Sequence, residues 1–403
     1  MTDASIFIDA SLLVGIFAML LVGTILGEFI KRLGFPPLIG QMISGIILGP
    51  MALNLVSQSK SMDLLTSIGV LFMMFLMGLS IDIEKVMGEN VYKYALISML
   101  GGSFAFISTA SITALLGFSL NTVILVGISF ISTSTAIGYM VLSNIGGRNS
   151  MVFKTIMAAG VSDDIYAILA LSLFATYVAN GVDLNKAFGM FMLVLGFIMF
   201  ILSFGRSITD RLIRYSRKSH DDQTIISFSL ILMFFVAYLS QSIEIASVTG
   251  AFLAGTILAR SPLSYKVITP RIESVSVSFF IPLFFVYTGA RINIYGLLSS
   301  QSIDFTIISI PLGVVLFLGL LMAVMASKYL GTYIATSTMG GYKDIEIHKM
   351  SLMMMPMGEY TLVIGQLGLA ELYLDTQVYS VLALVVLATT ILVPVMIRTA
   401  YQK

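Results

Sequence analysis

The 403-residue sequence contains no cysteine and no tryptophan, only two histidines, and charged residues at just 11% of its positions. The absence of cysteine excludes disulfides, thiolate metal sites and thiol redox chemistry. A histidine-rich metal centre is not expected either, because His220 and His348 both lie in polar, loop-like stretches. Without tryptophan, any aromatic belt at a membrane surface must consist of tyrosine and phenylalanine.

The shortage of charge decides the class of protein. Soluble domains carry roughly 25% charged residues, whereas here hydrophobic residues make up 58% of the chain. We therefore expect a protein whose solvent is lipid. The net charge of +1 gives no reason to expect nucleic-acid binding. The N-terminus lacks a basic region before its long apolar run, so we expect a membrane span there rather than a cleaved signal.

A transmembrane helix needs about 20 apolar residues. By this measure the sequence predicts an all-α membrane protein with about thirteen transmembrane helices in a single membrane transport domain, residues 1–403. The expected spans are 6–28, 37–55, 63–81, 92–117, 122–143, 153–178, 187–205, 224–242, 246–259, 274–290, 306–335, 349–369 and 377–398.

Lysine and arginine are sorted by membrane side. They gather in the loops after odd-numbered spans and at the C-terminal end, and the other side holds only Lys60, Lys186 and Arg291. Because positive residues favour the cytoplasmic side, we expect a multi-pass protein of the cell membrane. Its N-terminus would lie outside and its C-terminus in the cytoplasm.

Two glycine motifs recur seven spans apart. Residues 40–49 and 250–259 share the pattern G-x-x-[IL]-[SA]-G-x-I-L-[GA], and residues 78–83 resemble residues 289–294. An odd offset threads the second copy through the membrane in the opposite direction. The sequence therefore predicts an inverted repeat, helices 1–6 against 8–13, which is typical of secondary transporters.

Two spans are interrupted at repeat-related places. The fifth contains the polar run Ser132-Thr-Ser-Thr135, and the twelfth contains Pro356 and Gly358. Hydroxyl side chains and proline both weaken the helical hydrogen-bond ladder. Freed backbone groups at such breaks hold ions in transporters. The alternative is that hydroxyls join packed helices and that proline only kinks its helix.

Adjacent acids occupy the middle of the sixth span. A charge at the bilayer centre costs roughly 2.5 to 3.5 kcal/mol even on the mildest scale, so Asp163 and Asp164 are candidate ion- and proton-binding residues. Neighbouring helical residues point about 100° apart, so the two carboxylates have different surroundings. A buried acid paired with a base is the structural alternative, and it suits Asp163 better. We count Ser162, which precedes the pair, as a secondary site residue.

Lys328 in the eleventh span is the candidate partner of the acid pair, because it lies within a long apolar helix. An interfacial lysine is the alternative. Its repeat counterpart falls near Ser111, and that of the aspartates falls in residues 385–387, none of them charged. Glu359, after the second break, could bind freed amides or line the ion path. Arg291, Glu28, Asp63 and Asp82 lie at span ends and are expected to be interfacial.

The chain resembles the monovalent cation:proton antiporter-2 family, which includes sodium/proton and Kef-type potassium/proton exchangers. The matching stretches cover nearly the whole sequence and are residues 40–50, 132–137, 162–168, 284–289, 328–331 and 356–363. The resemblance implies a homodimer. It also implies a scaffold and dimer part at about 6–81 and 224–290, an ion-binding core at about 92–178 and 306–398, and a connector helix at about 187–205. The broken fifth and twelfth helices would cross.

The resemblance also implies roles for single residues. Asp164 matches the essential ion- and proton-binding carboxylate, where the monovalent cation would sit. Asp163 matches a position that is acidic in electrogenic members, and Lys328 matches the base that pairs with it. Thr133 and Ser134 lie where the unwound backbone contributes ligands.

These observations predict a secondary active antiporter, not an enzyme, without cofactors. We expect it to exchange Na⁺, with Li⁺ or K⁺ as alternatives, for protons by electrogenic alternating access that serves pH homeostasis. A Kef-type potassium/proton antiporter, a sodium-coupled symporter of organic solutes and a gated channel are the other hypotheses.

Overall fold

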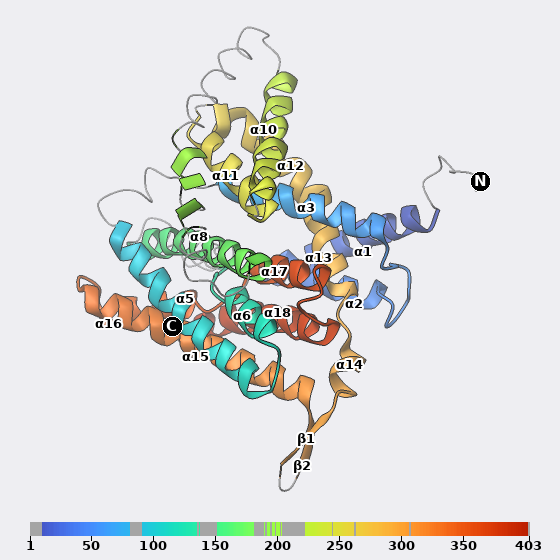
Figure 1. The fold of residues 1–403 in the computed structure, drawn as a ribbon, viewed down its shortest axis with the longest axis vertical. Coiled ribbons are helices and arrows are strands. Elements are labelled where there is room, and N and C mark those ends of the chain that lie inside the picture. The colour runs from blue at the N-terminus through green and yellow to red at the C-terminus, as the bar shows by residue number, and fades with distance from the viewer. Residues whose placement is uncertain are drawn as a thin grey trace.

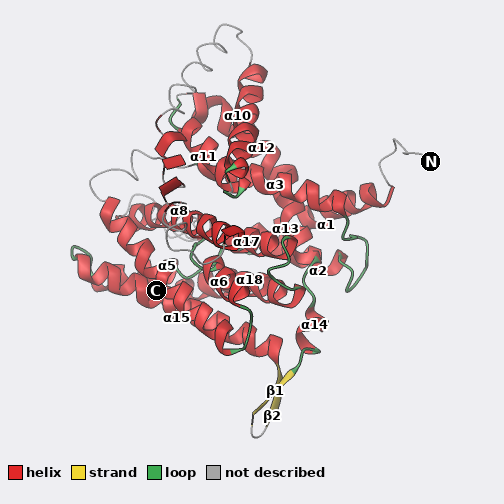
Figure 2. Cartoon of the chain, in the orientation of Figure 1, coloured by secondary structure: helices red, strands yellow, loops and turns green. Residues whose placement is uncertain are grey.

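The computed structural model describes residues 10–80, 91–134, 137, 151–180, 222–243, 245–261, 263–305 and 308–401, with scattered residues between 189 and 203. Nearly all of the described chain is helical, as the composition predicts (Figures 1 and 2). Among these residues, eight helices are long and apolar enough to cross a membrane, and three further apolar helices are shorter. The prediction of an all-α membrane protein is confirmed.

The first half of the chain forms six described helices. Proline or a serine cap starts the shorter ones: Pro37 begins α2, and Ser119 accepts a hydrogen bond from the amide of Thr122 at the start of α6. A serine cap accepts a hydrogen bond from a free amide of the first helical turn. A proline there has no amide hydrogen that needs a partner. The helices are α1 (Ala10–Arg32), α2 (Pro37–Leu48), α3 (Lys60–Leu79), α5 (Val91–Leu115), α6 (Leu120–Ser129) and α8 (Met151–Asn180).

The second half contains a long helical stretch in which π-helical turns alternate with α-helix. Its parts are η1 (Ser264–Ile268), α12 (Thr269–Val275), η2 (Ser276–Phe280) and α13 (Ile281–Ala290). Pro270 and Pro282 lie in the first turns of α12 and α13, where a missing amide costs least. The other helices are α10 (Asp222–Ser242), α11 (Ser247–Ala259), α14 (Ile294–Leu298), α15 (Leu312–Met339), α16 (Asp344–Met353), α17 (Glu359–Ala370) and α18 (Thr376–Tyr401).

The expected spans have helices in the structure wherever the chain is described. The seventh, 187–205, and the end of the fifth, after 137, lie largely outside the described residues. The eleventh begins later than expected, because Ser302–Phe305 (β1) and Ile308–Pro311 (β2) form an antiparallel hairpin. Both segments alternate polar and apolar residues over so few positions that their composition alone does not separate strand from helix.

The repeated glycine motifs lie where α2 packs against α13. A Cβ added to Gly45 would overlap the carbonyl oxygen of Val286, and one added to Gly289 would overlap that of Met42. Only glycine allows the two backbones to approach this closely.

The same contact recurs between α3 and α11. A Cβ on Gly78 would overlap the carbonyl oxygen of Phe252, and one on Gly255 would overlap that of Phe75. In the sequence repeat α2 corresponds to α11 and α3 to α13. The repeat therefore relates the α2–α13 contact to the α3–α11 contact, as an inverted repeat requires.

The helices fall into two groups by their packing. The first group, α1–α3 and α10–α13, and the second group, α5, α6, α8 and α15–α18, each pack mainly among themselves (Figure 1). Among the described residues a few hydrogen bonds join the groups: the Gln366 side-chain amide donates to the Thr66 hydroxyl at 3.4 Å, and Arg398 donates to the Gly34 carbonyl at 2.5 Å.

Substituting Gly45 by alanine tests the close glycine contact. Because the added methyl group meets backbone atoms that cannot rotate away, we expect a loss of about 1–3 kcal/mol or more in stability. Thermal unfolding in detergent measures it. Gly101→Ala is the control, since its Cβ would meet its nearest neighbour, the Thr332 hydroxyl, at an ordinary 3.4 Å. Equal stability of the two variants would contradict the packing described.

Candidate functional site

Two helix breaks cross within the second group. After α6 the chain is non-helical at 130–134, and α16 and α17 are separated by residues 354–358. The Ser134 amide donates to the Pro356 carbonyl at 2.9 Å. A Cβ added to Gly358 would lie 2.9 Å from the Ser134 Cβ, so glycine is needed for the crossing. The Ser/Thr run and the proline break their helices at the same depth.

Neighbouring side chains satisfy part of the backbone freed by the breaks. The Thr361 hydroxyl donates to the carbonyl of Ser129, the last residue of α6, at 2.7 Å. The Met357 amide donates to the Thr389 hydroxyl of α18 at 3.2 Å. Buried backbone groups need such partners in an apolar environment. The crossing is therefore held by fixed hydrogen bonds.

Lys328 and Asp163 form a fully buried ion pair. The Lys328 Nζ lies 2.8 Å from Asp163 Oδ2, and both side chains have 0% exposure. Lys328 comes from α15 and Asp163 from α8, so the pair joins the two repeats. An unpaired charge at this depth would cost several kcal/mol, which the opposite charge offsets.

The lysine also binds the first break. Its ammonium donates to the Thr133 hydroxyl at 2.9 Å and to the Ile131 carbonyl. Thr133 donates its own proton to Asp163 Oδ2 at 2.6 Å. An ammonium group has three donors, and Asp163, Thr133 and Ile131 engage all of them. Lys328 therefore has no donor left for Asp164.

Asp164 has different surroundings. It is 3% exposed, and the Ser132 hydroxyl donates to its Oδ1 at 2.6 Å. Among the described residues it has no ion-pair partner. Glu359 and Asp163 repel its charge electrostatically, and Lys328 attracts it. The site thus contains three carboxylates and one lysine, which leaves negative charge for a proton or a cation to neutralise.

Two consecutive hydroxyls of the first break each contact one of the two aspartates. Ser132 contacts Asp164 and Thr133 contacts Asp163. Successive residues of an extended segment point to opposite sides, so consecutive hydroxyls reach consecutive carboxylates. The sequence singled out Thr133 and Ser134 but not Ser132. The Ser134 hydroxyl is buried and has no hydrogen-bond partner among the described residues.

The other candidates differ in position. Glu359 begins α17 directly after the second break, near Asp164. The Ser162 hydroxyl donates to the Ala158 carbonyl of its own helix at 3.1 Å, so the structure does not bring it to the acid pair.

Two span-end residues that the sequence predicts to be interfacial, Arg291 and Asp63, contact each other in the structure. The Arg291 side chain is only 10% exposed and forms an ion pair with Asp63, which also accepts a 2.7 Å hydrogen bond from Tyr287. Sequence reasoning missed this pair, because the two residues are far apart in the chain. Glu28 is half-exposed and pairs with Lys31 and Arg32. Asp82 lies outside the described residues.

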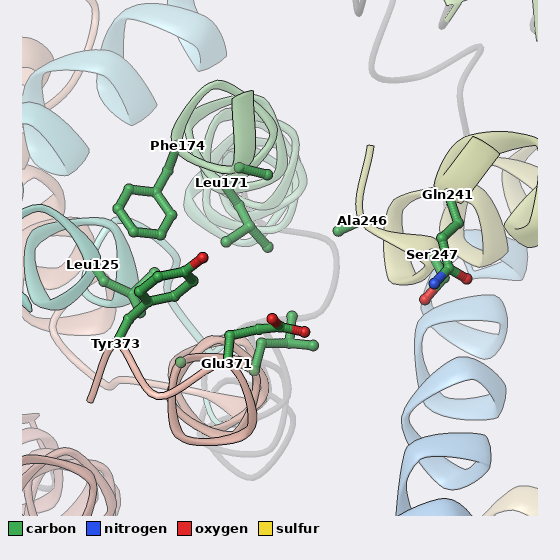
Figure 3. A pocket seen from close by; sticks show the side chains of 11 residues that line it. Leu125, Leu171, Phe174, Gln241, Ala246, Ser247, Glu371 and Tyr373 are labelled. Atoms are coloured by element: carbon green, nitrogen blue, oxygen red, sulfur yellow. The ribbon is translucent and has the colours of Figure 1, made fainter. Parts of the chain in front are cut away.

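A cavity of about 300 Å³ lies between the two helix groups (Figure 3). Phe174 and Tyr373 form one wall with edge-to-face rings, and the Glu371 carboxylate lies beside them. Gln241 and Ser247 of the first group face them across the cavity. Leu171 of α8, on this wall, follows Asp164 by seven residues. That spacing is two helical turns, about 10 Å, on the same helix face.

Comparison with known proteins shows what this chain is similar to. The family model described as the transmembrane sodium/hydrogen exchanger matches residues 16–403. The Na⁺/H⁺ antiporter of Enterococcus hirae is 28% identical over 393 residues, which cover 97% of this chain and 98% of that protein. The Na⁺/H⁺-K⁺ antiporter GerN of Bacillus cereus is 25% identical and covers 95% of each.

The fold is also similar to a solved structure. The sodium proton antiporter MjNhaP1 from Methanocaldococcus jannaschii matches with a TM-score of 0.70 over 97% of both chains, at 17% sequence identity.

Removing Lys328 tests the ion pair. Lys328→Ala leaves the Asp163 charge buried and unpaired, so we expect a loss of roughly 3–5 kcal/mol in stability. Adding Asp163→Asn removes that charge and should recover most of the loss. Thermal unfolding of the single and double variants in detergent measures both effects. Additive losses in the double variant would contradict direct pairing.

Proposed function

The chain belongs to the sodium/hydrogen exchanger family and is a membrane antiporter of a monovalent cation and protons, and we propose that Asp164 is the carboxylate at which the two compete. The observation behind this proposal is the contrast within the acid pair. Lys328 neutralises Asp163, whereas Asp164 is equally buried and has no cationic partner among the described residues. A buried carboxylate needs a proton or a cation, and binding one excludes the other.

Asp163 and Lys328 contribute to the stoichiometry in this proposal. When a cation binds at Asp164, the proton of Asp164 leaves. The cation would also take the place of the Lys328 ammonium as the counter-charge of Asp163, and the ion pair would then release a second proton. Two protons would then cross for each cation, so that exchange moves net charge. The described contact between Lys328 and Asp163 supports this coupling.

Alternating access would use the two helix groups. The first group corresponds to the proposed scaffold, about 6–81 and 224–290, and the second to the proposed core, about 92–178 and 306–398, with 187–205 as connector. Asp163, Asp164, Lys328 and both breaks all belong to the second group. Movement of that group against the first would carry the whole site. The small number of hydrogen bonds that join the groups among the described residues, such as Gln366 to Thr66, supports such a movement.

Na⁺ is the proposed cation, with Li⁺ and K⁺ as alternatives. The name of the relative from Enterococcus hirae supports Na⁺, and that of GerN supports K⁺ as a second substrate. The acid site offers carboxylate and hydroxyl oxygens, which suit such hard cations. The names of both relatives favour ion exchange over symport of an organic solute.

The proposed setting is a homodimer in the cell membrane, with the N-terminus outside, the C-terminus in the cytoplasm and pH homeostasis as the role. The sorting of lysine and arginine supports the orientation. Exposed apolar side chains along α1, such as Phe17, Leu21 and Ile25, support a face against lipid or a second copy.

Asp164→Asn tests the exchange site. The amide keeps the shape but cannot take up a proton or neutralise a cation, so we expect exchange to fall to background in proteoliposomes carrying a pH-sensitive dye. Glu28→Gln makes the same chemical change at a half-exposed span end and should exchange at the wild-type rate. A normal pH response to Na⁺ in Asp164→Asn would remove Asp164 from the mechanism.

The stoichiometry has a separate test. If two protons cross for each cation, an imposed membrane potential should speed or slow wild-type exchange according to its sign, at a fixed pH gradient. Each 100 mV is worth about 2.3 kcal/mol per net charge moved. Proteoliposomes with a K⁺ diffusion potential, assayed with Na⁺, measure this. An exchange rate that does not change with the membrane potential would show that one proton crosses for each cation, without net movement of charge.

A further inference from the structure

The hydroxyl of Tyr360 is buried without a partner. Tyr360 is 3% exposed, and its hydroxyl makes no hydrogen bond among the described residues. An unsatisfied buried polar group destabilises the fold, and phenylalanine would fill the same space without that cost. Buried tyrosines usually find a partner for the hydroxyl. Packing alone therefore does not explain the hydroxyl at this position.

Tyr360 lies beside the acid site. It is the second residue of α17, directly after Glu359 and the second break. Its hydroxyl is close enough to Asp164 and Glu359 for their charges to interact. The phenol and the two carboxylates therefore belong to the same buried region.

Tyr360 also lies on a face of α17 that leads to the cavity. Leu367, which lines the cavity, follows Tyr360 by seven residues, just as Leu171 follows Asp164. Seven residues are two turns, about 10 Å, and return to the same face of a helix. Tyr360 on α17 and Asp164 on α8 thus occupy equivalent levels below the cavity, on the faces that line it.

We propose that the Tyr360 hydroxyl is an oxygen ligand of the transported cation when that cation is bound at Asp164. This inference rests on the proposed role of Asp164. A cation that leaves water needs several oxygens in place of its hydration shell, and Asp164 with Ser132 supplies few. A proton needs only one carboxylate oxygen. Tyr360 therefore sets the affinity for the cation and the choice among cations, and leaves proton binding unchanged.

Tyr360→Phe removes this one oxygen and keeps the ring. The apparent KM for Na⁺ should rise about tenfold, the size expected for losing one contact to a charged group. The maximal rate should stay within about twofold of wild type, as should the pH profile at saturating Na⁺, and the ratio of KM values among Na⁺, Li⁺ and K⁺ should change. Proteoliposome exchange with each ion across a range of pH values measures all of these.

Thermal unfolding in detergent gives a second readout. Without Na⁺ the variant should be as stable as wild type or more stable, because the orphan hydroxyl is gone. Added Na⁺ should stabilise it less than it stabilises wild type.

Tyr379→Phe is the matched control. Tyr379 is a fully buried tyrosine of α18 whose hydroxyl lies near Thr288 and Arg291, away from the acid pair. Its loss should leave the KM for Na⁺ and the ion preference unchanged.

Two outcomes would overturn the proposal: an unchanged KM for Na⁺ in Tyr360→Phe, or an equal rise in KM for every cation together with a similar rise in the control. Asp164→Asn is assayed alongside. If it still exchanges, the proposed function fails; if it is inactive while Tyr360→Phe behaves as wild type, only the role of Tyr360 fails.

Discussion

The buried ion pair between Lys328 and Asp163 is the contact on which the rest of the site depends. It uses all the donors of the lysine on Asp163, Thr133 and the Ile131 carbonyl. The same contact therefore fixes the first break against α8 and α15 and leaves the lysine without a hydrogen-bond donor for Asp164. A buried carboxylate that the protein itself does not neutralise can hold a proton or a cation in turn, which is the chemistry that exchange requires.

The inverted repeat explains how such a contact arises. Its glycine contacts, Gly45 with Gly289 and Gly78 with Gly255, are related by the repeat and bring the backbones together in equivalent ways. The polar chemistry is not repeated: one repeat supplies the aspartates and the other supplies the lysine. A symmetric frame with asymmetric charges puts both breaks, the acids and the base at one depth, where lipid cannot hydrate them.

Sequence reasoning predicted most of this frame, because long apolar runs predict membrane helices. It also predicted the site, because an acid pair and a proline at mid-membrane depth are costly unless they serve a function. It did not single out Ser132, since the choice among four neighbouring hydroxyls depends on how the broken backbone turns. It missed the pairing of Asp63 with Arg291, which needs the packing of α3 against α13. It gave no reason to single out Tyr360, whose buried hydroxyl has no hydrogen-bond partner in the part of the chain that the structure describes.

Calorimetric titration of the purified protein with Na⁺, repeated in buffers of different ionisation enthalpy, tests the central claim most directly. If a cation displaces a proton from Asp164, the observed heat will vary with the buffer, and its slope will show protons released as Na⁺ binds. Na⁺ binding with a heat that is the same in every buffer would mean that no proton leaves, and competition at Asp164 would be wrong.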